Sequence, residues 1–275
     1  SFMELKPIEN FSDFLNAHSL QQQWRNRVRD ASVFLLSSFS RIPRQNHWVR
    51  FPYYHHVFND ERTNFASHLR YLQNFGDFIS LDDALEILES DNLIQGRYFC
   101  ITFDDGFKNS VTNAVPILID QNVPATFFLP TRYIGSSAKE ASDFWYPLQL
   151  TVEFLTWDDC RQMMQSNMTF GSHSVNHVRL IDLSDNEVER ELRDSKEQIE
   201  RELQIQCKHF CSPWGRPDID FSIDRDPEIA RQLGYRSFLT TRRGSVWHKP
   251  DPMMIERDHI IANWRKFQLS YFFSH

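Results

Sequence analysis

The 275-residue sequence predicts an α/β fold whose parallel strands form an open sheet or close into a barrel. Apolar runs over residues 98–103 and 125–129 have the length and composition of buried strands. The segment between them, residues 111–119, has the apolar spacing of a helix, and further amphipathic segments follow. The composition is globular, with 41% hydrophobic and 24% charged residues, which excludes a disordered or collagenous chain.

Capping residues mark where the helices between the strands begin and end. Ser80 followed by Asp83 is typical of an N-cap, and it opens an amphipathic run. Ser184 and Glu187 form a capping box ahead of a long segment whose apolar residues share one helical face. Pro227 is placed to begin a further helix, which a glycine seven residues later ends. Strands separated by such helices run parallel in one sheet.

The start of the chain differs from the rest. We expect residues 1–48 to form an N-terminal helical extension, and residues 49–275 to form the main domain. The extension contains several arginines and an apolar cluster at residues 33–36. We expect it to pack as a helical cap on the core of the main domain, or alternatively on a partner.

Charge and cysteine content restrict the class of protein. The net charge of −7, from 30 basic and 37 acidic residues, lacks the basic excess of a nucleic-acid-binding protein. No run of 18 apolar residues occurs, so no transmembrane helix is expected. No signal peptide pattern is visible, so we expect a cytoplasmic protein, while a trimmed export signal stays open. The four cysteines are expected to be free thiols, because Cys207 and Cys211 lack a second pair to complete a metal site.

Two adjacent carboxylates, Asp104 and Asp105, follow the first predicted strand. In a parallel α/β fold, ligands bind at the carboxyl ends of the strands. Two carboxylates in one site can divide the work, with one held by a cation and the other able to accept a proton. The alternative interpretation of Asp-Asp-Gly is a solvated turn.

Two later segments also contain residues suited to chemistry. His173 and His177 would share one face of a helical turn, where two neutral imidazoles can chelate one ion; alternatively they are two loop histidines. Residues 210–217 run from an apolar stretch into a turn at Pro213 and Trp214. Such a turn can direct a backbone N–H into a cleft and lay the indole along its wall. Taken alone, this segment is only a rigid loop.

Together and in this order, the three segments resemble the motifs of the NodB-homology polysaccharide deacetylases, carbohydrate esterase family 4. That family has a T-F-D-D segment, an H-[ST]-x-x-H segment and a proline-aromatic-glycine segment. The resemblance extends from about residue 54 to about residue 260, and the third segment is similar to a subgroup that reads F-x-x-P-aromatic-G. It implies a distorted (β/α) barrel, with residues 49–275 as a deacetylase-like catalytic domain.

Carried over position by position, the resemblance implies that Asp105, His173 and His177 bind one divalent metal ion. It also implies that Asp104 is the general base and that the backbone N–H of Trp214 helps to hold the oxyanion. An Asp-His-His set leaves coordination positions open for water and a substrate oxygen. These ligand types suit Zn²⁺ best, with Co²⁺, Ni²⁺, Fe²⁺ or Mn²⁺ as alternatives.

The chain departs from the family pattern in its third segment. Cys211 or Ser212 stands where an arginine is usual. Residues 254–260 are similar to the apolar-R-x-x-[IV] ending of the subgroup. We therefore expect Arg257 to orient Asp104 through a bidentate contact.

The general acid has no direct counterpart, and three histidines are candidates for it. We rank His259 first, His55 second and His248 third. The high aromatic content, 14%, is expected to be mainly core, with a few rings in the cleft. The candidates for the cleft are Tyr133, Trp145, Tyr146, Trp157 and Trp214.

The resemblance implies a metal-dependent hydrolase that removes the N-acetyl group of an amino sugar in a surface polysaccharide or a lipid-linked or nucleotide-linked intermediate. An N-deformylase is chemically equivalent. A non-sugar amidohydrolase on the same fold would have a small, closed cleft. A degenerate metal-binding or sugar-binding module is a further alternative, although it would have no need of Asp104. The sequence leaves the oligomeric state open.

Overall fold

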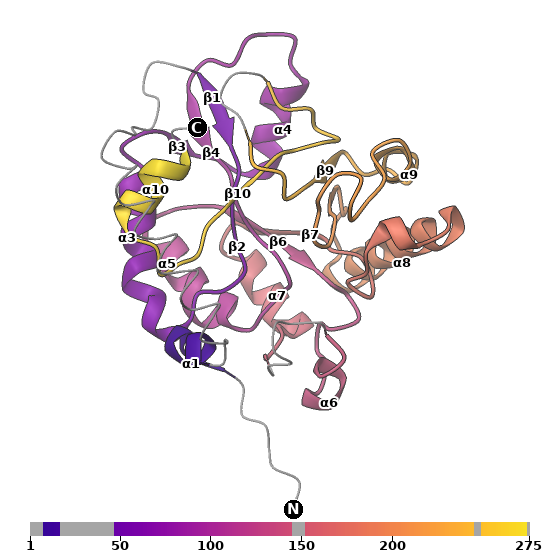
Figure 1. Ribbon diagram of the computed structural model, residues 1–275, viewed down its shortest axis with the longest axis horizontal. Coiled ribbons are helices and arrows are strands. Elements are labelled where there is room, and N and C mark those ends of the chain that lie inside the picture. The colour runs from indigo at the N-terminus through magenta and orange to yellow at the C-terminus, as the bar shows by residue number, and fades with distance from the viewer. Residues whose placement is uncertain (1–7, 17–46, 145–151, 245–248, 274–275) are drawn as a thin grey trace, which may run out of the picture.

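A computed structural model describes residues 8–16, 47–144, 152–244 and 249–273 (Figure 1). The apolar cluster at residues 33–36 therefore lies outside the described residues, as do Trp145, Tyr146 and His248.

Seven parallel strands form a curved half-barrel, which confirms the predicted fold class. A parallel bridge from Leu239 to Ile255 joins the last strand of the sheet to the segment that leads into the first, so the two edges approach each other. In sheet order the strands are β10 (Asp258–His259), β2 (Pro52–Tyr54), β5 (Ile101–Phe103), β6 (Ala125–Leu129), β7 (Met168–Ser172), β8 (His209–Cys211) and β9 (Ser237–Leu239).

A second, three-stranded sheet continues from one side of the half-barrel. It consists of β1 (Trp48–Arg50), β4 (Arg97–Phe99) and β3 (Asp77–Phe78). The single strand predicted over residues 98–103 is therefore wrong, because β4 and β5 belong to different sheets. The break falls at Cys100, whose N–H donates to the carbonyl oxygen of Arg50 (2.9 Å). The neighbouring segment passes from β1 to β2 at the same level. The two segments therefore stay paired across the break.

Helices cover the outside of the half-barrel, as Figure 1 shows. The predicted caps are confirmed: the Ser80 side chain accepts from the backbone N–H of Asp83, and Ser184 and Glu187 form a reciprocal capping box. The described helices of the main domain are α3 (Arg62–Leu72), α4 (Leu81–Glu89), α5 (Val115–Asp120), α6 (Ala138–Ala141), α7 (Trp157–Met164), α8 (Asp185–Leu203), α9 (Asp226–Gln232) and α10 (Lys266–Phe273), with short turns η1 (Asn59–Glu61), η2 (Ser110–Ala114) and η4 (Leu180–Asp182). None of these described helices is long and apolar enough to cross a bilayer.

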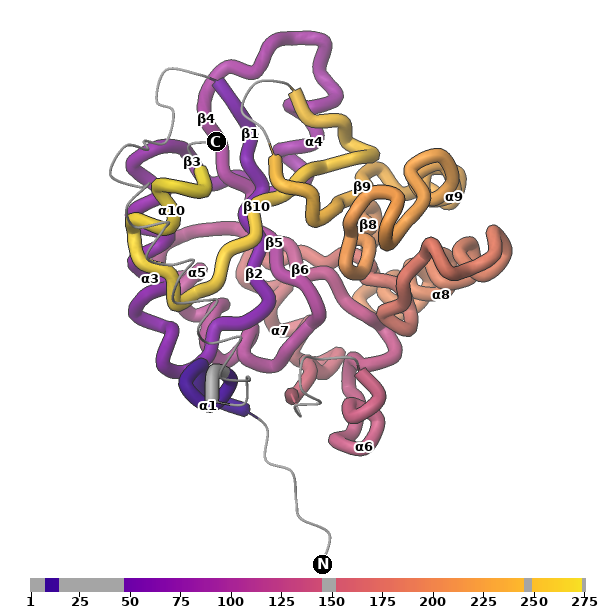
Figure 2. The backbone as a smooth tube through the Cα atoms, viewed as in Figure 1, coloured from indigo at the N-terminus to yellow at the C-terminus, as the bar shows by residue number. Residues whose placement is uncertain are grey.

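Of the predicted N-terminal extension, the structure describes one short helix, α1 (Phe11–Asn16). The Asp60 carboxylate accepts hydrogen bonds from the backbone N–H groups of Phe11 (2.7 Å) and Ser12 (3.2 Å), which ties α1 to η1. The tube in Figure 2 places α1 at the same end of the molecule as α6. Strand β1 begins at Trp48, one residue before the predicted domain boundary.

Aromatic rings fill the core, as the composition predicts. Phe103 and Phe127, from neighbouring strands, stack with ring centroids 4.8 Å apart. Two of the rings proposed for the cleft belong to the core instead. Tyr133 is 3% exposed in a separate cluster with Phe154 and other rings, and Trp157 packs against the main core from the start of α7. Burying such large aromatic side chains gains free energy, so they lie in the core even where the spacing in the sequence suggests a place in the cleft.

Candidate metal centre and catalytic cavity

The predicted chemical residues meet at one end of the half-barrel. Asp104 and Asp105 directly follow β5, and His173 directly follows β7. Trp214 lies in the turn after β8, and His259 ends β10. All these strands are parallel, so their carboxyl ends lie at the same rim, which is where parallel α/β barrels carry their sites.

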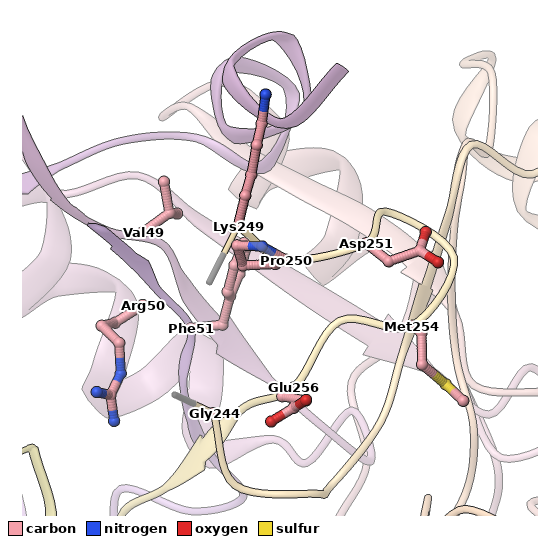
Figure 3. A pocket seen from close by; sticks show the side chains of 9 residues that line it. All are labelled: Val49, Arg50, Phe51, Gly244, Lys249, Pro250, Asp251, Met254 and Glu256. Atoms are coloured by element: carbon pink, nitrogen blue, oxygen red, sulfur yellow. The ribbon is translucent and has the colours of Figure 1, made fainter. Parts of the chain in front are cut away.

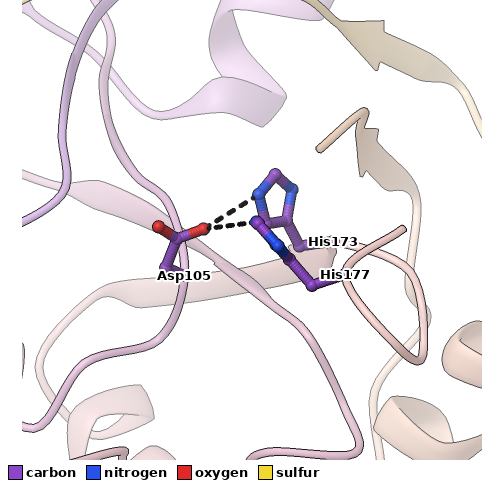
Figure 4. Close-up of side chains that lie close together, drawn as sticks. All are labelled: Asp105, His173 and His177. Carbon is purple, nitrogen blue, oxygen red and sulfur yellow. Dashed lines mark ion pairs between the residues drawn. The ribbon is translucent and has the colours of Figure 1, made fainter. Parts of the chain in front are cut away.

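Asp105, His173 and His177 form a compact cluster, here called the metal cluster (Figure 4). Asp105 Oδ1 lies 3.1 Å from His173 Nε2 and 3.0 Å from His177 Nε2. All three side chains are buried, and one ligand atom from each lies within 4.8 Å of the others. Burial by itself raises the pKa of Asp105, but His177 and His173 outweigh it and hold that pKa well below its ordinary value. The cluster therefore presents one anionic oxygen and two imidazole nitrogens to a common point.

The hydrogen bonds around the metal cluster fit a divalent cation. His173 Nδ1 lies 2.8 Å from the carbonyl oxygen of Cys211, which can accept only, so Nδ1 carries the proton and Nε2 is left as a lone-pair donor. Apart from its contacts with the two imidazoles, Asp105 Oδ1 is buried without a hydrogen-bond partner. A buried oxygen left in this state is costly unless a cation binds there. The three residues thus suit a metal ion held by Asp and two His, with further positions open.

The two histidines are not on a helix, which corrects the prediction of a helical turn. They lie in the loop after β7, where Ser174 (φ 64°) and His177 (φ 52°) have left-handed backbone conformations. The Glu191 carboxylate, from α8, accepts hydrogen bonds from two backbone N–H groups of this loop, those of Val175 (2.9 Å) and Asn176 (3.0 Å). A tertiary contact, not local helix geometry, therefore brings the imidazoles together.

Asp104 is held by the guanidinium group of Arg257. Arg257 Nη1 donates to Asp104 Oδ1 (2.8 Å) and Nη2 donates to Oδ2 (2.7 Å), which is the bidentate contact expected from the sequence. Cys211 Sγ lies 3.7 Å from both carboxylate oxygens, beside this pair. Burial by itself raises the pKa of Asp104, but Arg257 outweighs it and holds that pKa below its ordinary value. Asp104 is therefore a fixed anion beside the metal cluster.

His55 and His259 also meet at this rim. His55 Nδ1 lies 3.2 Å from His259 Nε2, and the other ring nitrogen of His55 lies 3.8 Å from Asp105 Oδ2. The His55 side chain is 32% exposed. Burial lowers the pKa of His259 to about 3, so this imidazole is neutral at pH 7. His55 therefore stands between His259 and the metal cluster.

The turn after β8 places the indole of Trp214 against the metal cluster. The ring centroid of Trp214 lies 4.6 Å from that of His177, and its backbone φ is 57°. Pro213 before it is buried. Gly215 after it also has a positive φ, and a Cβ there would lie 2.9 Å from the backbone nitrogen of Thr241. Glycine is therefore required for the turn that presents Trp214.

A cavity of about 570 Å³ opens beside these groups. Its volume is in the range of pockets that hold small ligands. Its lining includes the metal cluster together with His55, Asp104 and His259. It also includes a group of apolar residues: Phe11, Phe14, Phe58, Ile260 and Ile261.

Over residues 94–238, more than half of its length, the chain matches the family described as "Polysaccharide deacetylase". The chain belongs to the polysaccharide deacetylase family. A curated relative is the Bacillus subtilis (strain 168) protein YxkH, which is named for the same family and is 24% identical over 186 residues. The matched region is 67% of this chain and 60% of YxkH, so the chain matches less than two thirds of that relative.

Several solved structures, two of them described as deacetylases, have the same fold. IcaB from Ammonifex degensii superposes with a TM-score of 0.70 at 20% identity, covering 84% of this chain and 99% of its own. The Streptococcus pyogenes deacetylase PplD, solved in complex with acetate, superposes with a TM-score of 0.62 at 24% identity, covering 80% of this chain and 95% of PplD. The deacetylase domain of BpsB from Bordetella bronchiseptica superposes with a TM-score of 0.60 at 19% identity, covering 77% of this chain and 95% of that domain. At these identities the likeness establishes the fold.

Several residues of this cavity have no signal in the amino-acid sequence. Phe11 and Phe14 come from α1, more than 40 residues before the first motif of the barrel. Glu61 lines the cavity from η1, and Arg216 lines it from the turn after Trp214. The spacing of Phe11 and Phe14, three positions apart, was the one available hint, and this spacing is also typical of core packing.

A second cavity, of about 210 Å³, is lined by residues 49–51 and by residues of the segment from Gly244 to Glu256 (Figure 3). Its charged side chains point in different directions and bond to the protein itself. Arg50 pairs with Asp258 (2.8 Å), and the Lys249 ammonium donates to the carbonyl oxygen of Ser90. No convergent set of reactive groups is therefore found among the residues that line it.

Proposed function

We propose that this chain is a metal-dependent N-deacetylase acting on the acetamido group of an amino sugar. The observation that carries the proposal is the placement of Asp104 beside the metal cluster, held as an anion by Arg257 at the edge of a cavity. A metal-binding module would need the cluster alone. A buried carboxylate fixed next to it is what a hydrolase needs to accept a proton.

The arrangement supports hydrolysis of an amide by water. A divalent ion held by the metal cluster supplies Lewis acidity toward water and the amide carbonyl oxygen. Asp104 accepts a proton from the attacking water, and Arg257 keeps the carboxylate oriented while it does so. The oxygen of that water forms a bond to the carbonyl carbon, and the C–N bond then breaks. The backbone N–H of Trp214, after Pro213, is proposed to donate to the developing oxyanion.

The departing amine needs a proton, and we propose His55 as its donor. His55 faces the metal cluster and is partly exposed, whereas His259 lies behind it. Neutral His259 can accept a hydrogen bond from Nδ1–H of a protonated His55, whose Nε2–H then faces the cavity. This geometry favours His55 over His259, which the sequence ranked first. His259 becomes a positioning residue for the acid.

Three finer assignments belong to this proposal. The metal is proposed to be Zn²⁺, because two imidazoles and one carboxylate are ligands that zinc prefers. The segment from Phe210 to Gly215 supports the F-x-x-P-aromatic-G subgroup. The substrate is proposed to be an acetamido sugar, as the family name and the acetate bound by the related PplD suggest. A cytoplasmic location stays a prediction.

The test combines metal analysis with product analysis. Purified protein should contain about one divalent ion per chain. It should release acetate from at least one of a panel of acetamido sugars, and a chelator should abolish the release reversibly. His173→Ala should lose both ion and activity. Formate release from N-formyl sugars without acetate release would identify a deformylase instead. A bound ion with no release from any sugar, amide or imide would overturn the enzymatic proposal.

A further inference from the structure

Apolar residues of α1, of the turn just before η1 and of the segment after β10 line part of the catalytic cavity. Phe11 and Phe14 of α1 pack against Phe58, with ring centroids 6.4 and 5.9 Å away. Ile260 and Ile261, which follow β10, complete this wall. Phe11 and Phe14 are half-buried, and both line the cavity.

The position of α1 is fixed by hydrogen bonds to the main domain. Asp60 accepts from the N–H groups of Phe11 and Ser12, and the N–H of Asn59 donates to the carbonyl oxygen of Glu9 (2.9 Å). The same short segment of chain, residues 55–61, therefore holds the proposed acid at one end and the anchor of α1 at the other. The aromatic wall is a built part of the site.

Burial shifts the pKa values of two polar residues of the cavity lining, His56 and Glu61, toward their uncharged forms. His56 is stacked between Phe58 and Phe107, with centroids 4.5 and 4.1 Å away, and burial lowers its pKa well below its ordinary value. Burial raises the pKa of Glu61 to about 8, against opposing backbone hydrogen bonds from Phe58 and Asn263. His56 and Glu61 therefore add little charge to the apolar surface formed by the phenylalanine and isoleucine side chains.

We propose that this wall binds an apolar group attached to the sugar part of the substrate, so that the enzyme acts on an amino sugar linked to an alkyl or lipid chain. The inference rests on the proposed function and names its substrate class. The amide carbonyl must lie at the metal cluster, and the leaving amine must face His55. The sugar that carries this amine then extends past His55 toward His56 and Phe14, whose rings lie 6.4 Å apart. The apolar group thus belongs to the sugar side of the amide, not to the acyl side.

A second sugar unit is the main rival occupant, because aromatic rings also stack on sugars. A buried sugar unit brings several hydroxyl groups that lose water, and each one costs free energy unless it finds a partner. Phenylalanine and isoleucine side chains offer none. An alkyl chain gains free energy in proportion to its buried area and needs no hydrogen bonds.

The test compares three glycosides of N-acetylglucosamine with the metal-loaded protein, using the alkyl glycoside below its micelle concentration. The octyl glycoside should exceed the methyl glycoside by about tenfold or more in kcat/KM, mainly through a lower KM. It should also exceed the trimer of N-acetylglucosamine. Direct titration by calorimetry should show tighter binding of the octyl glycoside, with a more negative heat capacity change.

In the double variant Phe11→Ser/Phe14→Ser, kcat/KM for the octyl glycoside should exceed that for the methyl glycoside by only about twofold or less. Ile119→Ser, an exposed isoleucine on α5 outside this cavity, is the matched control and should keep the octyl-to-methyl ratio of the unmodified protein. Equal values for the octyl and methyl glycosides, or a preference for the trimer, would overturn the inference while deacetylation itself stands. A failure to release acetate from all three would overturn the proposed function, and the calorimetric comparison would still decide the binding question.

Discussion

Two clusters of histidine and aspartate lie at opposite ends of the half-barrel, next to different strands. The metal cluster lies after the carboxyl ends of β5 and β7. The other, here called the His209 cluster, lies at the start of β8 and β9. In it, His209 Nδ1 lies 2.8 Å from Ser237 Oγ, and His209 Nε2 lies 3.0 Å from Asp82 Oδ1. By residue type and distance alone, this second cluster has the pattern of a serine hydrolase triad.

The difference is in the partners and the access. In the His209 cluster both ring nitrogens have partners, and Ser237 is fully buried, so its hydroxyl cannot meet a substrate. In the metal cluster, apart from its contacts with the two imidazoles, a buried carboxylate oxygen has no hydrogen-bond partner, and the residues line a cavity. Buried polar atoms that converge on a cavity without full hydrogen bonding indicate a site for binding or catalysis. Buried polar atoms whose hydrogen bonds are all made within the protein indicate a structural link.

The largest effect is expected for Asp104→Asn. Removing the proposed base should lower kcat by about 10³-fold or more, because proton transfer to a positioned group contributes at this level. The metal content should not change, because Asp104 is held by Arg257 and not by the metal cluster. Parallel assays of acetate release and bound metal check this. A fully active variant would remove Asp104 from the mechanism.

A smaller catalytic effect is expected for His55→Gln, about 10²-fold in kcat, because the leaving amine would lack its proton donor. His259→Gln should act through His55 and should therefore lower kcat less. Profiles of kcat against pH for both variants make the comparison. A larger loss for His259→Gln, with His55→Gln near normal, would reverse the assignment.

His209→Leu should affect stability without affecting catalysis. It leaves the hydroxyl of Ser237 buried without its partner, so the free energy of unfolding should fall by about 1–3 kcal/mol. Chemical denaturation measures this loss, and kcat/KM of the folded variant should match that of the unmodified protein. Loss of activity in a fully folded His209→Leu protein would mean that the two clusters are coupled.

The effect confined to acidic pH concerns another fully partnered histidine, His68. Burial lowers its pKa to about 4, from an ordinary value of 6.5, so between these values the unfolded chain binds a proton that the folded chain does not. Stability should therefore fall as pH decreases from 6.5 to 4, by up to about 3 kcal/mol from this residue. His68→Gln should flatten that slope. Unfolding measured at several pH values tests it, and an unchanged slope would mean that other groups dominate.

Much of the barrel was predictable because local rules suffice there. The cap at Ser80 and the capping box at Ser184 follow from backbone groups within one turn, and the sequence shows them directly. The break at Cys100 was not predictable, because an apolar run looks the same whether it serves one sheet or two. The loop conformation of His177 depends on Glu191, which lies on a different element.

The sequence by itself determined which residue types are available and in what order along the strands. That was sufficient to identify the family, the cluster of Asp105 with two histidines, and Arg257 as the partner of Asp104. Only the tertiary structure decided that His55 stands in front of His259 and that α1 forms a wall of the cavity. The reason is physical: contacts between segments far apart in the chain depend on packing, which leaves no periodic signal in either segment.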